Sequence, residues 1–320
     1  MRLEVAKARQ IAQEWRWRIF CGSSGPNSLT YPVSRQAAAP CFIRWPDKLQ
    51  WAQGETFVQH LRVGLEQFVK VETAPIPQPY EGIMVFHFVR DGAEFPVVID
   101  YSDYMDRIDE TARRSAAVYL KMQYQIGGYD RLEGAADILP GGYTVPSKHS
   151  YCYLPPARRR SAALSLHDVY GRYSLQFATG IRKQAITLLS EQTEFDYYGG
   201  AGLVRYSQHL MDIATSKVCV DLPGNGPFCF RLLDYLAVGA CIVAVRHTAQ
   251  FPVPLEPGVH IAYVKDDLSD LLDVCRYYVE NDDARKTMQR NTREYFDRYL
   301  HRRQLAAYYL NCCLEATLPR

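Results

Sequence analysis

The sequence predicts an α/β protein with two Rossmann-like domains that face a central cleft. Its 320 residues exceed what one ordinary hydrophobic core organises and suit two domains of common size. In the second half, apolar runs of strand length alternate with helical stripes, which is typical of parallel βαβ units. Hydrophobic residues at 48% and charged residues at 22% exclude a disordered or fibrous chain.

The sequence pattern of the first half predicts some helices and strands more clearly than others. Two short apolar runs rich in β-branched residues, 83–89 and 96–100, predict buried strands. The pattern of residues 103–121 then predicts a helix capped by Ser102 or Asp103. The other elements expected here are loops with short elements over 22–56, a helix over about 54–70 and a short strand over 136–140.

Residues 140–162 have the composition of a linker, with glycines and the pair Pro155-Pro156. The arginine triplet 158–160 allows two interpretations. It could contact a nucleic acid or a phosphate, or it could form a solvated corner of the linker, and the second interpretation is favoured.

The second half is clearer, and Gly239 provides a stop signal for one of its helices. Strands are expected over 173–178, 195–198, 217–221, 241–245 and 259–264, and helices over 181–189, 203–213, 230–238 and 268–279. The resulting units are an N-terminal domain of residues 1–160, a C-terminal domain of residues 161–300, and a helix over 301–320, for which packing back on the N-terminal domain is one option.

Charge and cysteine content narrow the class of protein. Lys and Arg number 37 and Asp and Glu 35, so a net charge of +2 argues against a protein that coats nucleic acid. The longest uncharged apolar run, 235–245, falls short of the roughly 20 residues of a membrane helix. Nine cysteines without zinc spacing, and no secretory hydrophobic region in the first twenty residues, favour free thiols and a cytoplasmic location.

Several common motifs are absent from the sequence. It has no P-loop, no GxGxxG after a strand, no HExxH, no GxSxG and no Asp-x-Asp pair for a metal-held nucleotide. The glycine-rich run 199–202 follows a predicted strand but lacks dinucleotide spacing, so we expect a loop there.

The segment 221–231 carries the strongest signal of a binding site. A strand ends at Asp221, the run Gly224-Asn225-Gly226 lets the backbone approach a ligand, and a helix begins. Such a helix N-terminus presents unpaired N–H groups and favours anions. Arg231 lies in the first turn, where a cation is unfavourable unless a bound diphosphate compensates it. An ordinary βα loop with Arg231 facing solvent remains the alternative.

This segment and those that follow it resemble a known enzyme family. The resemblance covers 214–310 and rests on Gly224-Asn225-Gly226, on 230–236, on 239–243, and on 259–271 with Glu280-Asn281-Asp282. These motifs resemble the family 90 glycosyltransferases, the capsule-associated and protein O-glucosyl- and xylosyltransferase group, and more distantly the exostosin-type transferases.

The resemblance implies a GT-B fold and a hexosyl- or pentosyltransferase that needs no cofactor and no metal. The C-terminal domain would hold a nucleoside diphosphate sugar, with UDP favoured. The N-terminal domain would hold the acceptor, which is the hydroxyl of a saccharide, a protein or another molecule. Transfer would invert the configuration at the anomeric carbon of the sugar.

Residue roles follow by position. Arg231 matches the family arginine, Cys229 stands where the family has Ser, and Arg182 or Lys183 could replace an earlier Arg-Gly motif that this sequence lacks. Asp234 lies where many GT-B enzymes keep a ribose-binding acid. The expected donor-binding set is Thr179, Gly180, Arg182, Lys183, Gly224, Asn225, Gly226, Phe228, Cys229, Phe230, Arg231 and Asp234.

An inverting transfer also needs a base for the acceptor proton. Asp100 is the first choice, because it ends a predicted strand and ligands of α/β sheets lie outside the carboxyl ends of strands. Asp103, Asp106 and His87 follow, although Asp103 could be a helix cap and His87 a core histidine.

Two rival functions remain at this point. One is a GT-B-like protein that binds nucleotide sugars without turnover. The other is a nucleic-acid-directed protein, supported only by the arginine triplet and by basic residues near the two ends, Arg16, Arg18, Arg298, Arg302 and Arg303.

Overall fold

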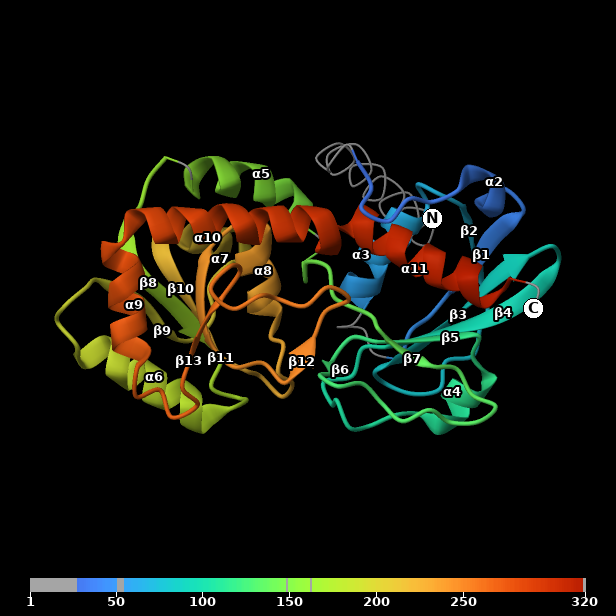
Figure 1. Ribbon diagram of the computed structural model, residues 1–320, viewed down its shortest axis with the longest axis horizontal. Coiled ribbons are helices and arrows are strands. Elements are labelled where there is room, and N and C mark those ends of the chain that lie inside the picture. Colours follow the sequence, from blue (N-terminus) through green and yellow to red (C-terminus); the bar gives the residue numbers. More distant parts are fainter. Residues whose placement is uncertain (1–27, 51–54, 148, 162, 319–320) are drawn as a thin grey trace, which may run out of the picture.

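Figure 1 shows the computed structural model of the protein, which describes residues 28–50, 55–147, 149–161 and 163–318. Two α/β domains lie side by side, as the sequence predicts, and the chain crosses back from the second to the first through α10 (Asp282–Tyr295) and α11 (Arg302–Ala316). The N-terminal half contains α2 (Arg35–Ala38), β1 (Cys41–Pro46), α3 (Glu55–Leu65), β2 (Lys70–Ala74), β3 (Ile83–Arg90), β4 (Ala93–Asp100), α4 (Glu110–Ser115), β5 (Val118–Lys121), β6 (Tyr124–Gln125) and β7 (Ile138–Pro140).

The second half begins with helix α5 and ends with α11. Its elements are α5 (Ser150–Ser161), β8 (His167–Tyr173), α6 (Thr179–Glu191), β9 (Tyr197–Ala201), α7 (Tyr206–Ala214), β10 (Ser216–Asp221), α8 (Phe230–Val238), β11 (Cys241–Val245), β12 (Ala249–Gln250), β13 (Ala262–Val264), α9 (Leu271–Glu280), α10 (Asp282–Tyr295), a π-helical turn (Phe296–Leu300) and α11 (Arg302–Ala316).

The N-terminal sheet is mixed, with the strand order β2-β1-β3-β4-β5-β7. Strands β4, β5 and β7 are parallel, whereas β3 and β4 form an antiparallel hairpin. Asp91 and Gly92 connect that hairpin with φ angles of 51° and 82°. An Asp-Gly pair suits this two-residue turn because both positions need a positive φ.

One helix prediction in this half is wrong. Residues 103–121 form a loop, the short helix α4 and strand β5 instead of one helix. Helix α4 starts late because the Asp109 carboxylate accepts a hydrogen bond from the N–H of Ala112 at 2.9 Å. The apolar run after it is buried between β4 and β7, where it completes the parallel part of the sheet. Residues 101–109 are thereby left as a loop at the carboxyl end of β4.

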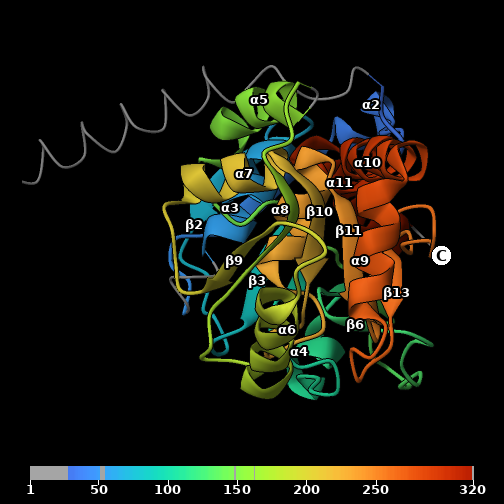
Figure 2. The same ribbon diagram turned by 90° about the vertical axis from the view of Figure 1, so that its left-hand side faces the viewer.

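The C-terminal sheet has the strand order β13-β11-β10-β8-β9, and all of its pairs are parallel. Alternate residues of β10 point to opposite faces: Val218 and Val220 belong to one core cluster and Cys219 to another. Helices α6 and α9 cover the first face, and α7 and α8 cover the second (Figure 2). Helix α8 ends at Gly239, whose φ is 91°, as predicted.

The strand expected over 173–178 is displaced. Strand β8 runs from His167 to Tyr173 and pairs with β10 from Ser216 to Cys219, so 174–178 is a loop. The sequence pattern hid this strand because its first residues, His167 and Asp168, are polar.

The expected linker contains helix α5, which packs on α7 and α8. Its buried residues Tyr151, Leu154 and Ala157 anchor it despite Pro155 and Pro156. From the same helix, Arg158 forms an ion pair with Asp297 at 2.7 Å and donates to the carbonyl oxygen of Ala237 at 2.7 Å. The arginine triplet is therefore partly a structural contact.

Helix α11 returns to the N-terminal domain and packs on α3 (Figure 1). A Cβ atom at Gly64 would lie 2.3 Å from the carbonyl oxygen of Arg302, so the two helices touch closely there. The eight cysteines within the described residues form no disulfide. Among those residues, no helix has the length and apolar content that crossing a membrane requires.

Candidate active site

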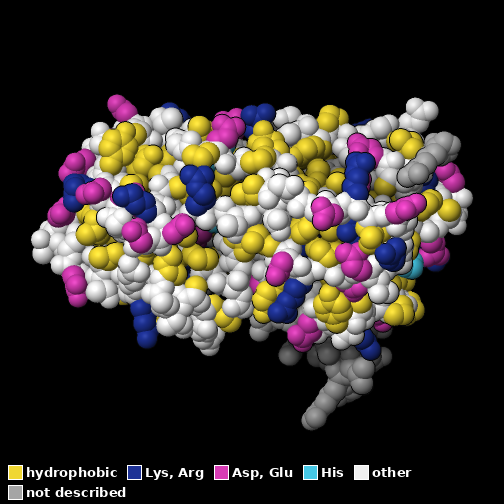
Figure 3. Space-filling model, turned by 60° about the horizontal axis from the view of Figure 1, so that its bottom comes forward, with side chains coloured by type: hydrophobic (Ala, Val, Ile, Leu, Met, Phe, Trp, Pro, Cys, Tyr) yellow, Lys and Arg dark blue, Asp and Glu magenta, His cyan; other side chains and the backbone are white. Residues whose placement is uncertain are grey.

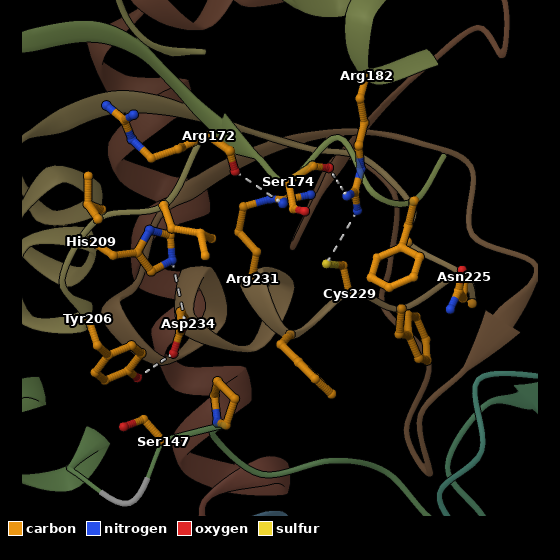
Figure 4. A pocket seen from close by; sticks show the side chains of 18 of the residues that line it. Ser147, Arg172, Ser174, Arg182, Tyr206, His209, Asn225, Cys229, Arg231 and Asp234 are labelled. Carbon is orange, nitrogen blue, oxygen red and sulfur yellow. Dashed lines mark hydrogen bonds and ion pairs between the residues drawn. The ribbon is translucent and has the colours of Figure 1, made fainter. Parts of the chain in front are cut away.

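A cavity of about 500 Å³ lies where the two domains meet, at the carboxyl ends of β8, β9 and β10 (Figure 4). The strand order switches at β8, because β9 pairs with one side of it and β10 with the other. Ligands of open α/β sheets bind at such a switch point, outside the carboxyl ends of the strands. The lining residues are Asp103, Pro146, Ser147, Arg172, Ser174, Phe177, Arg182, Gly202, Leu203, Val204, Tyr206, His209, Gly224, Asn225, Gly226, Phe228, Cys229, Phe230, Arg231 and Asp234.

Arg231 is held at the start of α8 by its neighbours. Its Nη2 lies 3.1 Å from a carboxylate oxygen of Asp221 and donates to the carbonyl oxygen of Leu222 at 2.7 Å. Its Nη1 donates to the carbonyl oxygen of Arg172 at 3.3 Å, and its guanidinium lies 4.6 Å from the ring centre of Tyr173. The side chain is only 7% exposed, so the alternative that it faces solvent is wrong.

Arg182 of α6 is the second arginine of the cavity. It donates to the carbonyl oxygens of Pro223 at 2.9 Å and Ser174 at 2.6 Å, and its Nη2 lies 3.8 Å from the Cys229 sulfur. Burial lowers the pKa of Arg182, and the neighbouring guanidinium of Arg231 lowers it further. Arg182 and Arg231 thus bring two positive charges to the cavity, and the carboxylate of Asp221 lies beside one of them.

Helix α8 begins without a side-chain cap, because Cys229 at its N-cap accepts no hydrogen bond through its side chain. Its first N–H groups therefore lack the partner that Ser or Asp would supply. This terminus opens on the same cavity as the two arginines.

Most of the donor-binding set predicted from sequence lines this cavity. The lining members are Arg182, Gly224, Asn225, Gly226, Phe228, Cys229, Phe230, Arg231 and Asp234. Thr179, Gly180 and Lys183 lie in the first turns of α6 and do not line it. The Thr179 hydroxyl instead donates to the carbonyl oxygen of Leu175 at 2.8 Å.

Asp234 belongs to a hydrogen-bonded cluster that the sequence did not reveal. Tyr206 donates to its Oδ1 at 2.7 Å, and His209 Nε2 lies 3.5 Å from its Oδ2 (Figure 4). The other ring nitrogen of His209 bonds to the hydroxyl of Tyr170 at 2.9 Å. No spacing in the sequence links α7 to α8, so only the packing of the two helices brings these groups together.

Asp103 is the carboxylate that the N-terminal domain brings to the cavity. It lies in the loop after β4 and faces the loop after β10, where the Asn225 side chain is its hydrogen-bond partner. Burial raises the pKa of Asp103 above its ordinary value, and the bond with Asn225 opposes that rise.

Asp100 lies below this loop and does not line the cavity. It is fully buried, and its Oδ2 accepts from Lys121 at 2.7 Å and from the Tyr119 hydroxyl at 2.8 Å. Its Oδ1 accepts from the hydroxyl and the N–H of Ser102 at 2.6 and 3.1 Å. Four hydrogen bonds leave this carboxylate little capacity to take an acceptor proton.

The remaining candidate bases also lie outside the cavity lining. The ring of His87 on β3 bonds to Glu94 of β4 at 2.7 Å, on the hairpin of the N-terminal domain. Asp106 is exposed to solvent in the loop that carries Asp103.

Within the residues that the structure describes, no three His, Cys, Asp or Glu side chains gather as metal ligands. The face in Figure 3 shows Lys and Arg interspersed with Asp and Glu, without a continuous basic surface. Arg16 and Arg18, which supported the nucleic-acid alternative, lie outside the described residues.

Comparison with known proteins agrees with this location. Residues 182–311 match a family model described as glycosyl transferase-like, from Arg182 in α6 into α11. No curated protein matches the chain. The match spans the arginines, the loop after β10 and helix α8. Residues 182–311 are therefore similar to a glycosyltransferase-like domain, which supports sugar transfer in general.

Proposed function

We propose that the protein is a metal-independent GT-B glycosyltransferase that inverts the configuration at the anomeric carbon of the transferred sugar. It would move a hexose or pentose from a nucleoside diphosphate sugar to an acceptor hydroxyl. The observation that carries the proposal is the cavity at the carboxyl ends of β8 and β10, where two buried arginines and an uncapped helix N-terminus face one carboxylate of the other domain. The preference for UDP rests on the resemblance to family 90.

The donor diphosphate fits against the N-terminus of α8. Unpaired N–H groups and the helix dipole stabilise a phosphate there, and Arg182 and Arg231 add positive charge. Together these groups supply the charge compensation that a divalent metal gives in other transferases. Phe177, Leu203 and Phe230 line the cavity and are exposed, so they offer an apolar surface to a base or sugar ring.

Asp103 is the base in this proposal. As the acceptor oxygen forms its bond to the anomeric carbon, the bond from that carbon to the diphosphate breaks, and Asp103 takes the acceptor proton. A carboxylate with a raised pKa is a better proton acceptor, and Asp103 reaches the cavity from the N-terminal domain, beside the loop after β10. Asp100 supports this loop from below.

Calorimetric titration with UDP and UDP-sugars tests the donor site, and an assay for donor hydrolysis and transfer tests turnover. We expect UDP to bind and to raise the melting temperature, because a ligand of the folded state stabilises it. Binding without hydrolysis or transfer over a broad acceptor panel would favour the rival nucleotide-sugar-binding protein. No binding of any nucleotide would contradict both.

Excess EDTA tests the charge compensation separately. We expect transfer to persist, since arginines and a helix terminus stabilise the negative charge of the leaving diphosphate. Activity that disappears with EDTA and returns with Mn²⁺ or Mg²⁺ would contradict this part of the proposal.

A further inference from the structure

We infer that Gln123 is a positioning residue that joins the donor side of the site to the acceptor side across the domain boundary. Its role in transfer rests on the function proposed above, whereas the contact itself does not. Gln123 lies two residues beyond β5 of the N-terminal domain, and its side chain reaches the loop after β10 of the C-terminal domain.

The side chain of Gln123 pairs with both backbone groups of Phe228. Its Nε2 donates to the carbonyl oxygen of Phe228 at 2.9 Å, and its Oε1 accepts from the N–H of Phe228 at 3.1 Å. Gln123 is 1% exposed, so water cannot replace these bonds without local opening. The amide thus bonds to the loop much as the backbone of an adjacent strand would.

Two further contacts tie the same loop to Asp103. A Cβ atom at Gly226 would lie 2.5 Å from the backbone oxygen of Asp103 and 2.8 Å from Gln123 Nε2. The loop can therefore approach this closely only with glycine at that position. Next to it, the Asn225 side chain bonds to the Asp103 carboxylate.

Phe228 is itself fixed on the C-terminal side. Its ring stacks on Phe251 with centres 4.1 Å apart and lies edge-on to His247 at 5.2 Å. Gln123 thus bonds to a residue that cannot shift without repacking the C-terminal core. The amide therefore holds the loop after β10 against the N-terminal domain, next to Asp103.

Removing this contact should affect turnover more than donor binding. A displacement of about 1 Å between reacting groups costs about a hundredfold in rate. The donor contacts at α8 and α6 remain in place without Gln123. We therefore expect Gln123→Ala to lower kcat for transfer at least tenfold and to change the UDP Kd less than threefold.

The contact is tested directly by hydrogen exchange of residues 222–229. In Gln123→Ala we expect the Phe228 amide to exchange at least ten times faster than in the wild type. Gln184→Ala is the matched control, since this exposed glutamine donates one hydrogen bond to the carbonyl oxygen of Asp267, away from the cavity. Gln123→Glu keeps the acceptor for the Phe228 N–H and loses the donor, so we expect intermediate values. It replaces the alanine variant if that one does not fold.

The two measurements separate the possible failures. Unchanged exchange in Gln123→Ala overturns the inference whether or not the protein transfers sugar. Faster exchange with kcat within twofold of the wild type overturns the positioning role and leaves sugar transfer intact. A wild type that neither binds UDP nor turns over a donor contradicts the proposed function, and the exchange rates then decide alone whether Gln123 joins the two sides.

Discussion

Two loops meet in the cleft, and each follows a buried carboxylate that ends a strand. Asp100 ends β4 below the loop 101–109, and Asp221 ends β10 below the loop 222–229. Both side chains are fully buried. Asp100 accepts four hydrogen bonds, from Lys121, Tyr119 and Ser102. Neither oxygen of Asp221 accepts one with good geometry.

Within the described part of the chain, one arginine and one histidine lie beside the oxygens of Asp221. Arg231 lies at 3.1 Å and His247 Nε2 at 3.5 Å from its oxygens. A buried carboxylate whose oxygens accept several hydrogen bonds stabilises the fold. A buried carboxylate that accepts none, next to an arginine that lines a cavity, indicates a place where function outweighs stability. We therefore assign a supporting role to Asp100, and to Asp221 a part in holding Arg231 in place.

The largest effect is expected at Asp103, in the loop above Asp100. Asp103→Asn removes the proton acceptor and keeps the size of the side chain, so transfer should fall by about 10²–10⁴ while UDP affinity stays near wild type. The pH profile should lose activity on acidification with an apparent pKa above the ordinary value for aspartate, because burial raises the pKa of Asp103. Steady-state kinetics over pH provide the measurement.

Asp106→Asn is the matched control, since Asp106 lies exposed in the same loop. It should leave transfer unchanged. If Asp103→Asn retains more than a tenth of wild-type transfer, the base is another residue.

Asp100→Asn should act on stability instead. Loss of its charge leaves Lys121 buried without a full counter-charge, which should lower the free energy of unfolding by about 3–5 kcal/mol. Urea unfolding measures it, and UDP affinity of the folded fraction should be unchanged. Adding Lys121→Met should recover part of the loss. A variant as stable as wild type but unable to transfer would reverse the roles of Asp100 and Asp103.

Arg231→Ala tests the other carboxylate. We expect UDP binding to weaken about ten- to a hundredfold, because a charge-assisted contact with the diphosphate is worth roughly 1.5–3 kcal/mol. The variant should also be less stable, since Asp221 loses its nearest cation. Titration of UDP against the folded protein separates the two effects, with Arg290→Ala as a surface control. Unchanged UDP affinity would show that Arg231 neutralises Asp221 and does not bind the diphosphate.

The smallest effect is expected for Cys229→Ser. A serine at the N-cap of α8 can accept a hydrogen bond from the first turn, which cysteine does not do here. The free energy of unfolding should rise by about 0.5–1 kcal/mol, and the UDP Kd should change less than threefold. Cys312→Ser, in the middle of α11, offers no such cap and should not stabilise. A destabilised Cys229→Ser would mean that the thiol itself packs favourably.

The sequence predicted the cavity lining of the C-terminal domain better than that of the N-terminal domain. Strands such as β10 and β11 are short, apolar and punctuated by Pro and Gly, so their order and the loop 224–226 follow from local pattern. Residues 103–121 gave a helical pattern, and only the burial of β5 between two parallel strands shows otherwise.

The groups that sequence did not reveal are those defined by contacts between distant segments. His209 meets Asp234 because α7 packs beside α8, and Gln123 meets Phe228 across the domain boundary. Asp100 and Asp103 look equivalent in sequence, since both lie near the end of one strand. Their difference depends on Tyr119 and Lys121, which lie 19 and 21 residues after Asp100 in the chain.

The proposed function requires that a nucleoside diphosphate binds in the cavity at the N-terminus of α8. Cys229 lines that cavity, whereas Cys152 and Cys312 do not. Peptide-resolved alkylation of the wild-type protein by iodoacetamide, with and without UDP, therefore measures whether UDP occupies this cavity. We expect saturating UDP to slow modification of Cys229 at least tenfold and to leave Cys152 and Cys312 unchanged. Equal rates at Cys229 with and without saturating UDP would contradict the claim.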